Sequence, residues 1–318
     1  YIFENAHLYP DKPCIIEQST GKEYTYAEVR AISAAVAARL PGLGVGQGDV
    51  VMLLLPNCAE FVFLFLGVAM AGSVVTTANP LYKPAEIHRQ VQSCQAKLIV
   101  TQAVYVEKLA EECERHIRIM TIDEEKEGHD HVSVLFEEKE GPKNPSVGDE
   151  DEADKKSGIR PIEPDDVVAL PYSSGTTGLP KGVMLTHRSL LTSVAQQVDG
   201  ENPNLHFSPD DVVLCVLPLL HIFSLNSVLL CSLRAGSAVA IMQRFEVVAL
   251  LEFVQRYRIS VLAVVPPIVL AITKCPTKHL YDLSSVRKVL SGAAPMGKEL
   301  EDALRECLPN AVIGQVLK

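Results

Sequence analysis

The chain has 318 residues, of which 47% are hydrophobic, and its mean hydropathy is +0.16. This length predicts about two domains or subdomains around a large buried core, and the composition excludes a globally disordered chain. The net charge of −10 argues against a nucleic-acid partner, which usually meets a basic protein face.

The first predicted helix begins at the capping box Thr25-Tyr26-Ala27-Glu28, in which Glu28 bonds back to the Thr25 backbone. Apolar residues then recur at helical spacing up to Leu40, where Pro41 and a glycine cluster end the helix. That cluster follows a helix rather than a strand and contains no G-x-G-x-x-G, so it is interpreted as a loop.

Apolar strands and helical segments alternate in the next part of the chain. The expected strands are 49–55, a strand near Val74, and 97–101, and the expected helices are 59–71 and a segment after Pro84. Strands separated by helices predict right-handed βαβ units and an α/β fold, in which layered, mostly parallel sheets are flanked by helices.

An acidic, lysine-rich stretch at 123–166 has few large apolar residues, and most of it is interpreted as a solvated loop or linker. An acidic interaction site is the alternative. The expected organisation is therefore a first α/β subdomain at 1–122, the linker at 123–166, and a second α/β subdomain at 167–318.

Buried strands are expected again at 211–217, 237–242, 261–265 and 288–290, with a break at Pro266-Pro267 and a helix at 268–274. Small residues at 291–295 follow the last of these strands. They leave room for a ligand at the edge where open α/β sheets bind substrates.

Two long uncharged runs, 61–78 and 212–233, reach the length of a membrane span. Gly72 divides the first run, and Pro218 and His221 interrupt the second, which would be costly in lipid. We therefore expect a helix followed by a strand in the first run, a buried strand at the start of the second, and a membrane span in neither.

Eight cysteines are spread along the chain without a C-x-x-C pair, and most lie in apolar runs. This pattern predicts free buried thiols in a reducing compartment, and neither a zinc site nor a disulfide framework. The chain begins with Tyr1 and shows no signal peptide, so we expect the natural N-terminus to be missing and the location to be cytoplasmic.

A ten-residue stretch at 173–182, SSGTTGLPKG, combines glycines, hydroxyl side chains and a lysine between a strand-like run (167–170) and a helix-like run (188–198). Glycines let backbone N–H groups close on an anion, hydroxyls add donors, and Lys181 supplies a charge. Thr186 is the expected N-cap of the following helix, whose N-terminus would favour an anion. The alternative is a surface loop.

The stretch is not a P-loop, because Pro180 stands where that motif needs glycine and Gly182 follows the lysine. It resembles the nucleotide-binding signature of the adenylate-forming enzymes, and in particular the box of the 4-coumarate:CoA ligases, which also continues with Val-Met-Leu-Thr-His. The resemblance runs from Tyr1 to Gln315 and implies the N-terminal domain of the adenylate-forming fold.

The chemistry that this resemblance implies has two steps. A carboxylate attacks the α-phosphate of ATP to give an acyl-adenylate and pyrophosphate, and the thiol of coenzyme A then displaces AMP. The implied co-substrates are ATP and coenzyme A, the implied metal is Mg²⁺, and the implied substrate is a hydroxycinnamic acid of phenylpropanoid metabolism. The residues that match the family's ATP contacts are Ser173, Ser174, Gly175, Thr176, Thr177, Gly178 and Lys181.

The resemblance assigns His221 to a place beside the adenylate and the thiol entry path, although a lone histidine in an apolar run is otherwise interpreted as a core residue. Arg244 aligns with a family lysine that contacts coenzyme A. On its own it is an ordinary solvated surface arginine.

The resemblance also implies a pocket for the aromatic acid, formed by Phe223, Ser227, Gly292, Ala293 and Gln315. Simple core packing is the alternative for Phe223. Family members that act on 4-coumarate often carry tyrosine there, so phenylalanine predicts weaker discrimination for the 4-hydroxyl group of the substrate.

The family continues after its Gly-Gln with Gly-Tyr-Gly-Met-Thr-Glu, whereas this chain ends Val316-Leu317-Lys318. The resemblance therefore implies that the acidic residue for Mg²⁺, the ribose-binding aspartate and the C-terminal domain are absent. We expect no metal ligand within the chain and little or no activity from it alone. A peroxisomal address would also lie beyond this end.

Other adenylate-forming enzymes share the phosphate loop, so a fatty-acyl or another aryl acyl-CoA synthetase remains an alternative. The segments 218–223 and 292–295 favour hydroxycinnamates. A non-catalytic nucleotide-binding isoform is a further alternative from a different class of protein.

Overall fold

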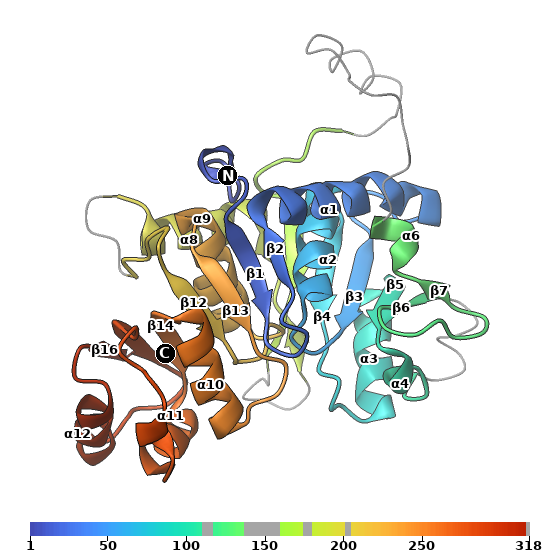
Figure 1. The fold of residues 1–318 in the computed structure, drawn as a ribbon. Coiled ribbons are helices and arrows are strands. Elements are labelled where there is room, and N and C mark those ends of the chain that lie inside the picture. Colours follow the sequence, from blue (N-terminus) through green and yellow to red (C-terminus); the bar gives the residue numbers. More distant parts are fainter. Residues whose placement is uncertain (110–116, 137–159, 174–179, 201–204, 316–318) are drawn as a thin grey trace. The chain divides into compact units, whose positions relative to one another are not determined.

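The computed structural model describes residues 1–109, 117–136, 160–173, 180–200 and 205–315 (Figure 1). The chain divides into two compact units. Unit 1 comprises Tyr1–Val29, Pro56–Ala59 and Leu191–Lys318, and unit 2 comprises Arg30–Leu55 and Glu60–Leu190.

Unit 1 is built on a seven-stranded sheet with the order β16-β15-β14-β12-β13-β1-β2. Its strands are β1 (Pro13–Glu17), β2 (Glu23–Thr25), β12 (Val212–Cys215), β13 (Ala238–Ile241), β14 (Val261–Val264), β15 (Lys288–Ser291) and β16 (Val312–Gln315). All neighbours are parallel except β2, which runs antiparallel to β1.

Helices cover both faces of this sheet, which is why its strands are apolar runs without alternation. They are η3 (Phe223–Leu230), a π-helix that continues into α9 (Cys231–Ala235), then α10 (Val247–Tyr257), α11 (Pro266–Lys274) and α12 (Lys298–Cys307), with short 3₁₀ turns η1 (Ala6–Leu8) and η4 (Lys278–Leu280). The connection from β12 to β13 crosses the sheet towards β1. The connections that lead on to β14, β15 and β16 cross it in the opposite direction. Right-handed crossovers then place η3 and α9 on one face and the other three helices on the opposite face (Figure 1).

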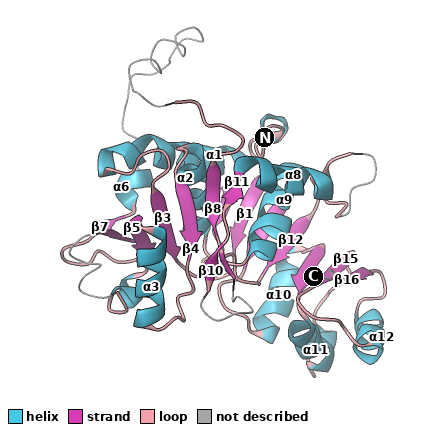
Figure 2. Cartoon of the chain, turned by 180° about the vertical axis from the view of Figure 1, so that it is seen from behind, coloured by secondary structure: helices cyan, strands magenta, loops and turns pink. Residues whose placement is uncertain are grey.

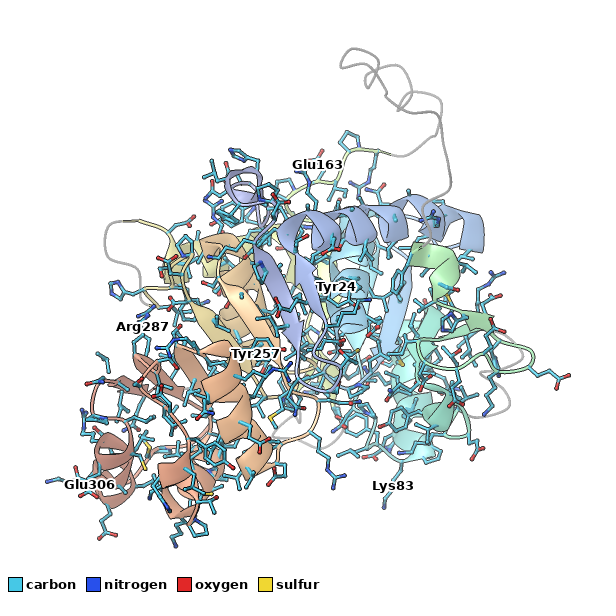
Figure 3. The ribbon with its side chains drawn as sticks, viewed as in Figure 1. Tyr24, Lys83, Glu163, Tyr257, Arg287 and Glu306 are labelled. Carbon is cyan, nitrogen blue, oxygen red and sulfur yellow. The ribbon has the colours of Figure 1, made fainter. Side chains whose placement is uncertain are left out.

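The core of unit 1 lies under α10 and α11. Leu250 and Phe253 of α10 and Ile272 of α11 join Leu214 and Leu262 of the sheet in one buried cluster. At the amino edge of the same sheet, the Arg287 guanidinium (Figure 3) donates to the buried carboxylate of Asp211.

Unit 2 has a second seven-stranded sheet with the order β11-β8-β4-β3-β5-β6-β7 (Figure 2). Its strands are β3 (Val50–Leu54), β4 (Val74–Thr77), β5 (Ala96–Thr101), β6 (Arg118–Thr121), β7 (Asp130–His131), β8 (Val167–Leu170) and β11 (Leu185–Thr186), and a separate ribbon pairs β9 (Tyr172–Ser173) with β10 (Lys181–Gly182). Only β11 runs antiparallel to its neighbour in the seven-stranded sheet.

The helices of unit 2 are α2 (Ala59–Met70), which has its first residue in unit 1, α3 (Pro84–Cys94), α4 (Ala103–Val106) and α6 (Ser133–Phe136), with a 3₁₀ turn η2 (Leu40–Leu43). Two further helices, α1 (Tyr26–Arg39) and α8 (His187–Val198), run from one unit into the other. Ile87 and Val91 of α3 pack with Met52, Leu54 and Ile99 in the core of this unit.

The α/β class and the parallel sheets predicted from the sequence are confirmed, and the expected strands and helices lie within a few residues of the observed ones. The capping box is present: the Thr25 N–H donates to Glu28 (2.7 Å) and the Glu28 N–H donates to the Thr25 hydroxyl (3.2 Å). The expected break separates β14 from α11, but the helix begins at Pro266, two residues earlier than expected. Proline needs no N–H partner in the first turn of a helix.

The two units differ from the subdomains 1–122 and 167–318 expected from the sequence. The first strand belongs to unit 1 because β1 pairs with β13, and β8 belongs to unit 2 because it pairs with β4. In the expected linker, β7 and α6 are ordered elements of unit 2, while residues 137–159 lie outside the described ranges.

The two uncharged runs fold into short elements. The first contains α2 and β4, and the second contains β12, η3 and α9. Across the described residues, none of the helices has the length and hydropathy that a membrane crossing needs. The seven cysteines in these ranges carry free thiols, and burial raises the pKa of Cys215 to about 12. Cys113 lies outside the described ranges.

Candidate functional site

The predicted phosphate loop connects the two strands of a small antiparallel ribbon. Ser173 pairs with Lys181, and Tyr172 pairs with Gly182. This ribbon follows the carboxyl end of β8, so it begins at the edge of the unit 2 sheet where parallel sheets bind ligands. The predicted contacts Ser174, Gly175, Thr176, Thr177 and Gly178 lie outside the described residues.

Gly182 lies close to an aromatic ring. A Cβ atom at this position would lie 3.2 Å from Cζ of Tyr172, closer than ordinary van der Waals contact. Burial raises the pKa of Tyr172, which also hydrogen-bonds to Ser93. The tyrosine ring therefore fixes the base of the ribbon on which Lys181 is exposed.

A cavity of about 410 Å³ adjoins the ribbon within unit 2. Tyr172 and Pro180 line it from the ribbon, and Tyr82 and Arg89 line it from the region of α3. Its volume and its mixture of aromatic and charged side chains suit part of a small-molecule ligand. Sequence reasoning missed Tyr82 and Arg89, because no motif connects them to a loop about 90 residues further on.

The helix after the ribbon does not offer its N-terminus to a ligand. The Ser189 N–H donates to the Thr186 hydroxyl (3.1 Å), which confirms the predicted N-cap. The N–H groups of His187 and Arg188 donate to the carbonyls of Asp166 (3.0 Å) and Pro164 (2.7 Å). Because its first three N–H groups are satisfied internally, the expectation of an anion at this helix terminus is wrong.

In unit 1, the predicted site residues follow the carboxyl ends of neighbouring parallel strands. His221 follows β12, Arg244 follows β13, Gly292 and Ala293 follow β15, and Gln315 ends β16. Carboxyl ends of parallel strands meet at one edge of a sheet, so this arrangement agrees with the ligand-binding edge expected from the sequence.

His221 has an imidazole that burial keeps from protonating readily. It is exposed to solvent on one side, yet desolvation lowers its pKa below the usual value for histidine. Its backbone N–H donates to the Pro218 carbonyl (3.0 Å), and its carbonyl accepts from the Leu225 N–H (3.0 Å). These backbone bonds hold the residue at the start of η3, and its lowered pKa favours the neutral imidazole at pH 7.

Phe223 and Ser227 lie on the π-helix η3. The other six residues of this helix are buried, whereas these two are partly exposed and are four residues apart. With about 4.4 residues per π-helical turn, they share one face of the helix. Such π-helical turns occur frequently at functional sites. This helix was not predicted from the sequence, because six of its eight residues are buried and show no helical periodicity.

Gly292 and Ala293 form the loop after β15. The Gly292 N–H donates to the Val264 carbonyl (3.0 Å), and Ala293 has a φ of 67°. A left-handed conformation costs a residue with a Cβ atom about 1 kcal/mol or more and is concentrated at functional sites. Gln315 braces this loop, since its Oε1 accepts from the Met296 N–H (3.0 Å).

Arg244 lies exposed in the link between β13 and α10. Glu246, two residues later, caps α10 by accepting from the N–H groups of Val248 (3.1 Å) and Ala249 (2.6 Å). The cap fixes where the helix begins, and the arginine side chain remains in solvent.

In the described ranges, no group of three or more His, Cys, Asp or Glu side chains could hold a metal ion.

The fold and these residues define a class. Two doubly wound parallel sheets, with the predicted site residues after the carboxyl ends of their strands, are typical of α/β enzymes that bind nucleotides. The family model described as "AMP-binding enzyme" matches residues 2–316. The chain therefore belongs to the AMP-binding enzyme family.

Within this family the chain is similar to 4-coumarate–CoA ligases. It is 57% identical over 316 residues to the 4-coumarate–CoA ligase of Pinus taeda and 52% identical over 317 residues to 4-coumarate–CoA ligase CCL1 of Humulus lupulus. Each match covers 99% of this chain and 56% of the relative. The chain thus spans about half the length of the curated relatives it matches.

Solved structures share the fold at lower identity. A luciferase-like enzyme from the mealworm Zophobas morio has a TM-score of 0.83 at 22% identity, and the match covers 98% of this chain and 69% of that chain. The N-terminal domain of FACL13 from Mycobacterium tuberculosis has a TM-score of 0.80 at 25% identity, and this match covers 99% of this chain and 73% of that chain. The predicted N-terminal fold of the adenylate-forming enzymes is confirmed.

Proposed function

We propose that this chain is the acid-activating part of a 4-coumarate–CoA ligase, acting on a hydroxycinnamic acid. The observation that carries the proposal is the 57% identity to such a ligase across 99% of the chain. Further support comes from unit 1, where the residues that the family resemblance assigns to the acid follow the carboxyl ends of parallel strands.

In the first step, a carboxylate oxygen of the acid attacks the α-phosphorus of ATP. The new O–P bond forms as the bond to pyrophosphate breaks, which leaves an acyl-adenylate. Ser173, the hydroxyls and backbone N–H groups of 174–178, and Lys181 hold the phosphates in this proposal, because donors preorganised around developing charge lower the barrier. The aromatic acid is bound by Phe223, Ser227, Gly292 and Ala293. Gln315 accepts a hydrogen bond from the Met296 N–H and so holds the loop that contains Gly292 and Ala293.

In the second step, the sulfur of coenzyme A attacks the acyl carbon, and the bond to AMP breaks. His221, neutral because burial lowers its pKa, can accept the thiol proton or a hydrogen bond from it. Arg244 is exposed and can pair with a phosphate of coenzyme A. The protein is proposed to work in the cytoplasm.

The proposal is tested by pyrophosphate release from ATP with a panel of cinnamic and fatty acids. Two proteins are compared: the 318-residue chain, and a chimaera in which the remainder of the Pinus taeda ligase follows Gln315. We expect the chimaera to respond to cinnamic acids and the chain alone to be nearly silent. A response to fatty acids only would favour a fatty-acyl-CoA synthetase. ATP binding with no pyrophosphate release by either protein would favour a non-catalytic nucleotide-binding protein.

The role of Lys181 is tested in the same chimaera. Lys181→Ala should slow pyrophosphate release about 10- to 150-fold, because a charge-assisted hydrogen bond contributes about 1.5–3 kcal/mol. Lys97→Ala is the matched control, since Lys97 is an exposed lysine of the same unit that pairs with Asp49 on the surface (2.8 Å). Equal rates in the two variants would remove Lys181 from the proposed phosphate site.

A further inference from the structure

Asn57 is a buried polar residue that belongs to unit 1, although β3 just before it and α2 just after it lie in unit 2. Its side chain is only 5% exposed. The chain is held here by a second buried group, because the Ala59 N–H donates to Oε1 of Glu17 at the end of β1 (2.9 Å). Residues 56–59 are thereby fixed at the carboxyl edge of the unit 1 sheet.

The side-chain amide of Asn57 joins the ends of two strands. Its Nδ2 carries two hydrogens and donates to the carbonyls of Leu217 (3.0 Å) and Met242 (3.3 Å), and the carbonyl of Cys215 lies 3.5 Å away. Its Oδ1 accepts from the N–H of Leu219 (2.7 Å). The end of β12, the turn after it and the end of β13 are therefore connected through one side chain.

Only one orientation of the amide fits these partners. A flipped amide would place Oδ1 against three carbonyl oxygens and Nδ2 against an N–H donor. Aspartate, which has nearly the same shape, would place an oxygen against the same three carbonyls. The position thus requires a side chain that donates on one side and accepts on the other.

The turn held by Asn57 leads directly to His221. Leu217 and Leu219 are bound to Asn57, and between them the Pro218 carbonyl accepts from the His221 N–H (3.0 Å). Met242, whose carbonyl accepts from Asn57 at the end of β13, lies two residues before Arg244. The loops that carry His221 and Arg244 are therefore both connected by hydrogen bonds to the side-chain amide of Asn57.

We propose that Asn57 is a positioning residue that sets the backbone of the loop carrying His221 and the start of the loop carrying Arg244. The inference rests on the proposed function for the roles of those two side chains, and on the hydrogen bonds of Asn57 for the rest. Asn57 itself is assigned no contact with a substrate.

Hydrogen exchange read by mass spectrometry tests the structural half of the proposal in the 318-residue chain. In Asn57→Ala, amides of 217–223 should exchange roughly tenfold faster, because the buried Leu219 N–H loses its acceptor. Ser260→Ala is the matched control. The Ser260 hydroxyl donates to Asp211 (2.7 Å) at the opposite edge of the same sheet. Removing this hydroxyl should leave the exchange rates of the amides of 217–223 unchanged.

A second variant covers the case in which Asn57→Ala folds poorly. Asn57→Asp keeps the acceptor for the Leu219 N–H and loses the donors to Leu217 and Met242. Amide exchange should therefore become faster at 215–217 and 242–244, while the Leu219 amide should still exchange nearly as slowly as in the parent chain. Unchanged exchange in these segments would overturn the proposal. So would equal opening of the whole of unit 1 in both variants, since Asn57 would then be a general core residue.

Kinetics in the chimaera test the functional half. Asn57→Ala should lower kcat for thioester formation about 10- to 100-fold, since a misplacement of about 1 Å can cost on the order of 100-fold in rate. The KM for ATP should stay close to that of the parent, because the phosphate ribbon belongs to unit 2. An unchanged kcat overturns the positioning role even if exchange increases. A parent chimaera that is silent with every acid defeats the proposed function instead, and hydrogen exchange still decides whether Asn57 holds the loop.

Discussion

At the scale of single residues, Phe223 carries a prediction about substrate choice. It is half-buried on η3, and it offers no polar group to the 4-hydroxyl of 4-coumarate. We expect the chimaera to turn over cinnamate and 4-coumarate with similar kcat/KM, and Phe223→Tyr to shift the ratio about 10-fold or more towards 4-coumarate, because a paired buried hydroxyl creates discrimination. Competition between the two acids in one reaction measures the ratio. A parent enzyme that already prefers 4-coumarate strongly would contradict the assignment of Phe223 to the pocket.

The pKa of His221 gives a second prediction at this scale. Burial disfavours the charged imidazolium, so the pKa of the folded protein lies below the usual value of about 6.5. The contribution of His221 to the free energy of unfolding is therefore fully present at a pH above the pKa of the unfolded chain. It is lost as the pH falls through the lowered pKa of the folded protein, because the unfolded chain binds the proton more readily. An NMR titration of the histidine C2 protons, with the signal assigned by its loss in His221→Gln, should place this residue below 6.5. A value at or above 6.5 would show that the ring is not desolvated.

The sequence suggested which side chains could form the candidate site, but it indicated little of how they are held. The composition of 173–182 indicated a phosphate loop, and the resemblance supplied His221 and the residues that are proposed to bind the acid. The amide of Asn57 was not predicted, because its partners at 215–219 and 242 lie more than 150 residues away along the chain. The left-handed φ of Ala293 was also missed, since alanine gives no sign of a conformation that favours glycine.

At the scale of secondary-structure elements, the crossing of α1 and α2 in unit 2 depends on one glycine. A Cβ atom on Gly67 would lie 2.5 Å from Cβ of Val36 and 2.7 Å from the Ser33 carbonyl oxygen. Because neither the helix backbone nor a β-branched side chain can move easily, Gly67→Ala should lower the free energy of unfolding by about 1–3 kcal/mol. Urea denaturation followed by circular dichroism measures it. Gly42→Ala is the control, since nothing lies within 4 Å of that position; equal losses would mean that the helix crossing is not tight.

The success of sequence reasoning also differs between elements. The strands β3, β12, β13 and β14 were predicted because each is a short apolar run bounded by polar or turn residues. The hairpin of β1 and β2 was missed, because its position is decided by pairing with β13 more than 200 residues later. The helix η3 was missed because six of its eight residues are buried, which removes the periodicity that marks a helix.

At the scale of the whole molecule, the path of the chain links the stability of the two units. The chain passes from one unit to the other four times, at 29/30, 55/56, 59/60 and 190/191, and three of these passages lie inside the continuous helices α1, α2 and α8. Helices melt cooperatively, so a disturbance in one unit is expected to lower the stability of the other. We therefore expect a single unfolding transition.

Two variants test this coupling from opposite ends. Gly67→Ala acts in unit 2, and Arg287→Ala acts in unit 1, where it leaves the buried Asp211 carboxylate without its guanidinium partner at a cost of about 1–3 kcal/mol. Because the chain has no tryptophan, hydrogen-exchange labelling at increasing urea is the suitable measurement, with β3 reporting on unit 2 and β14 on unit 1. Each variant should lower the urea midpoint of both strands together. A midpoint that falls in one strand only would mean that the units unfold independently despite the helices that join them.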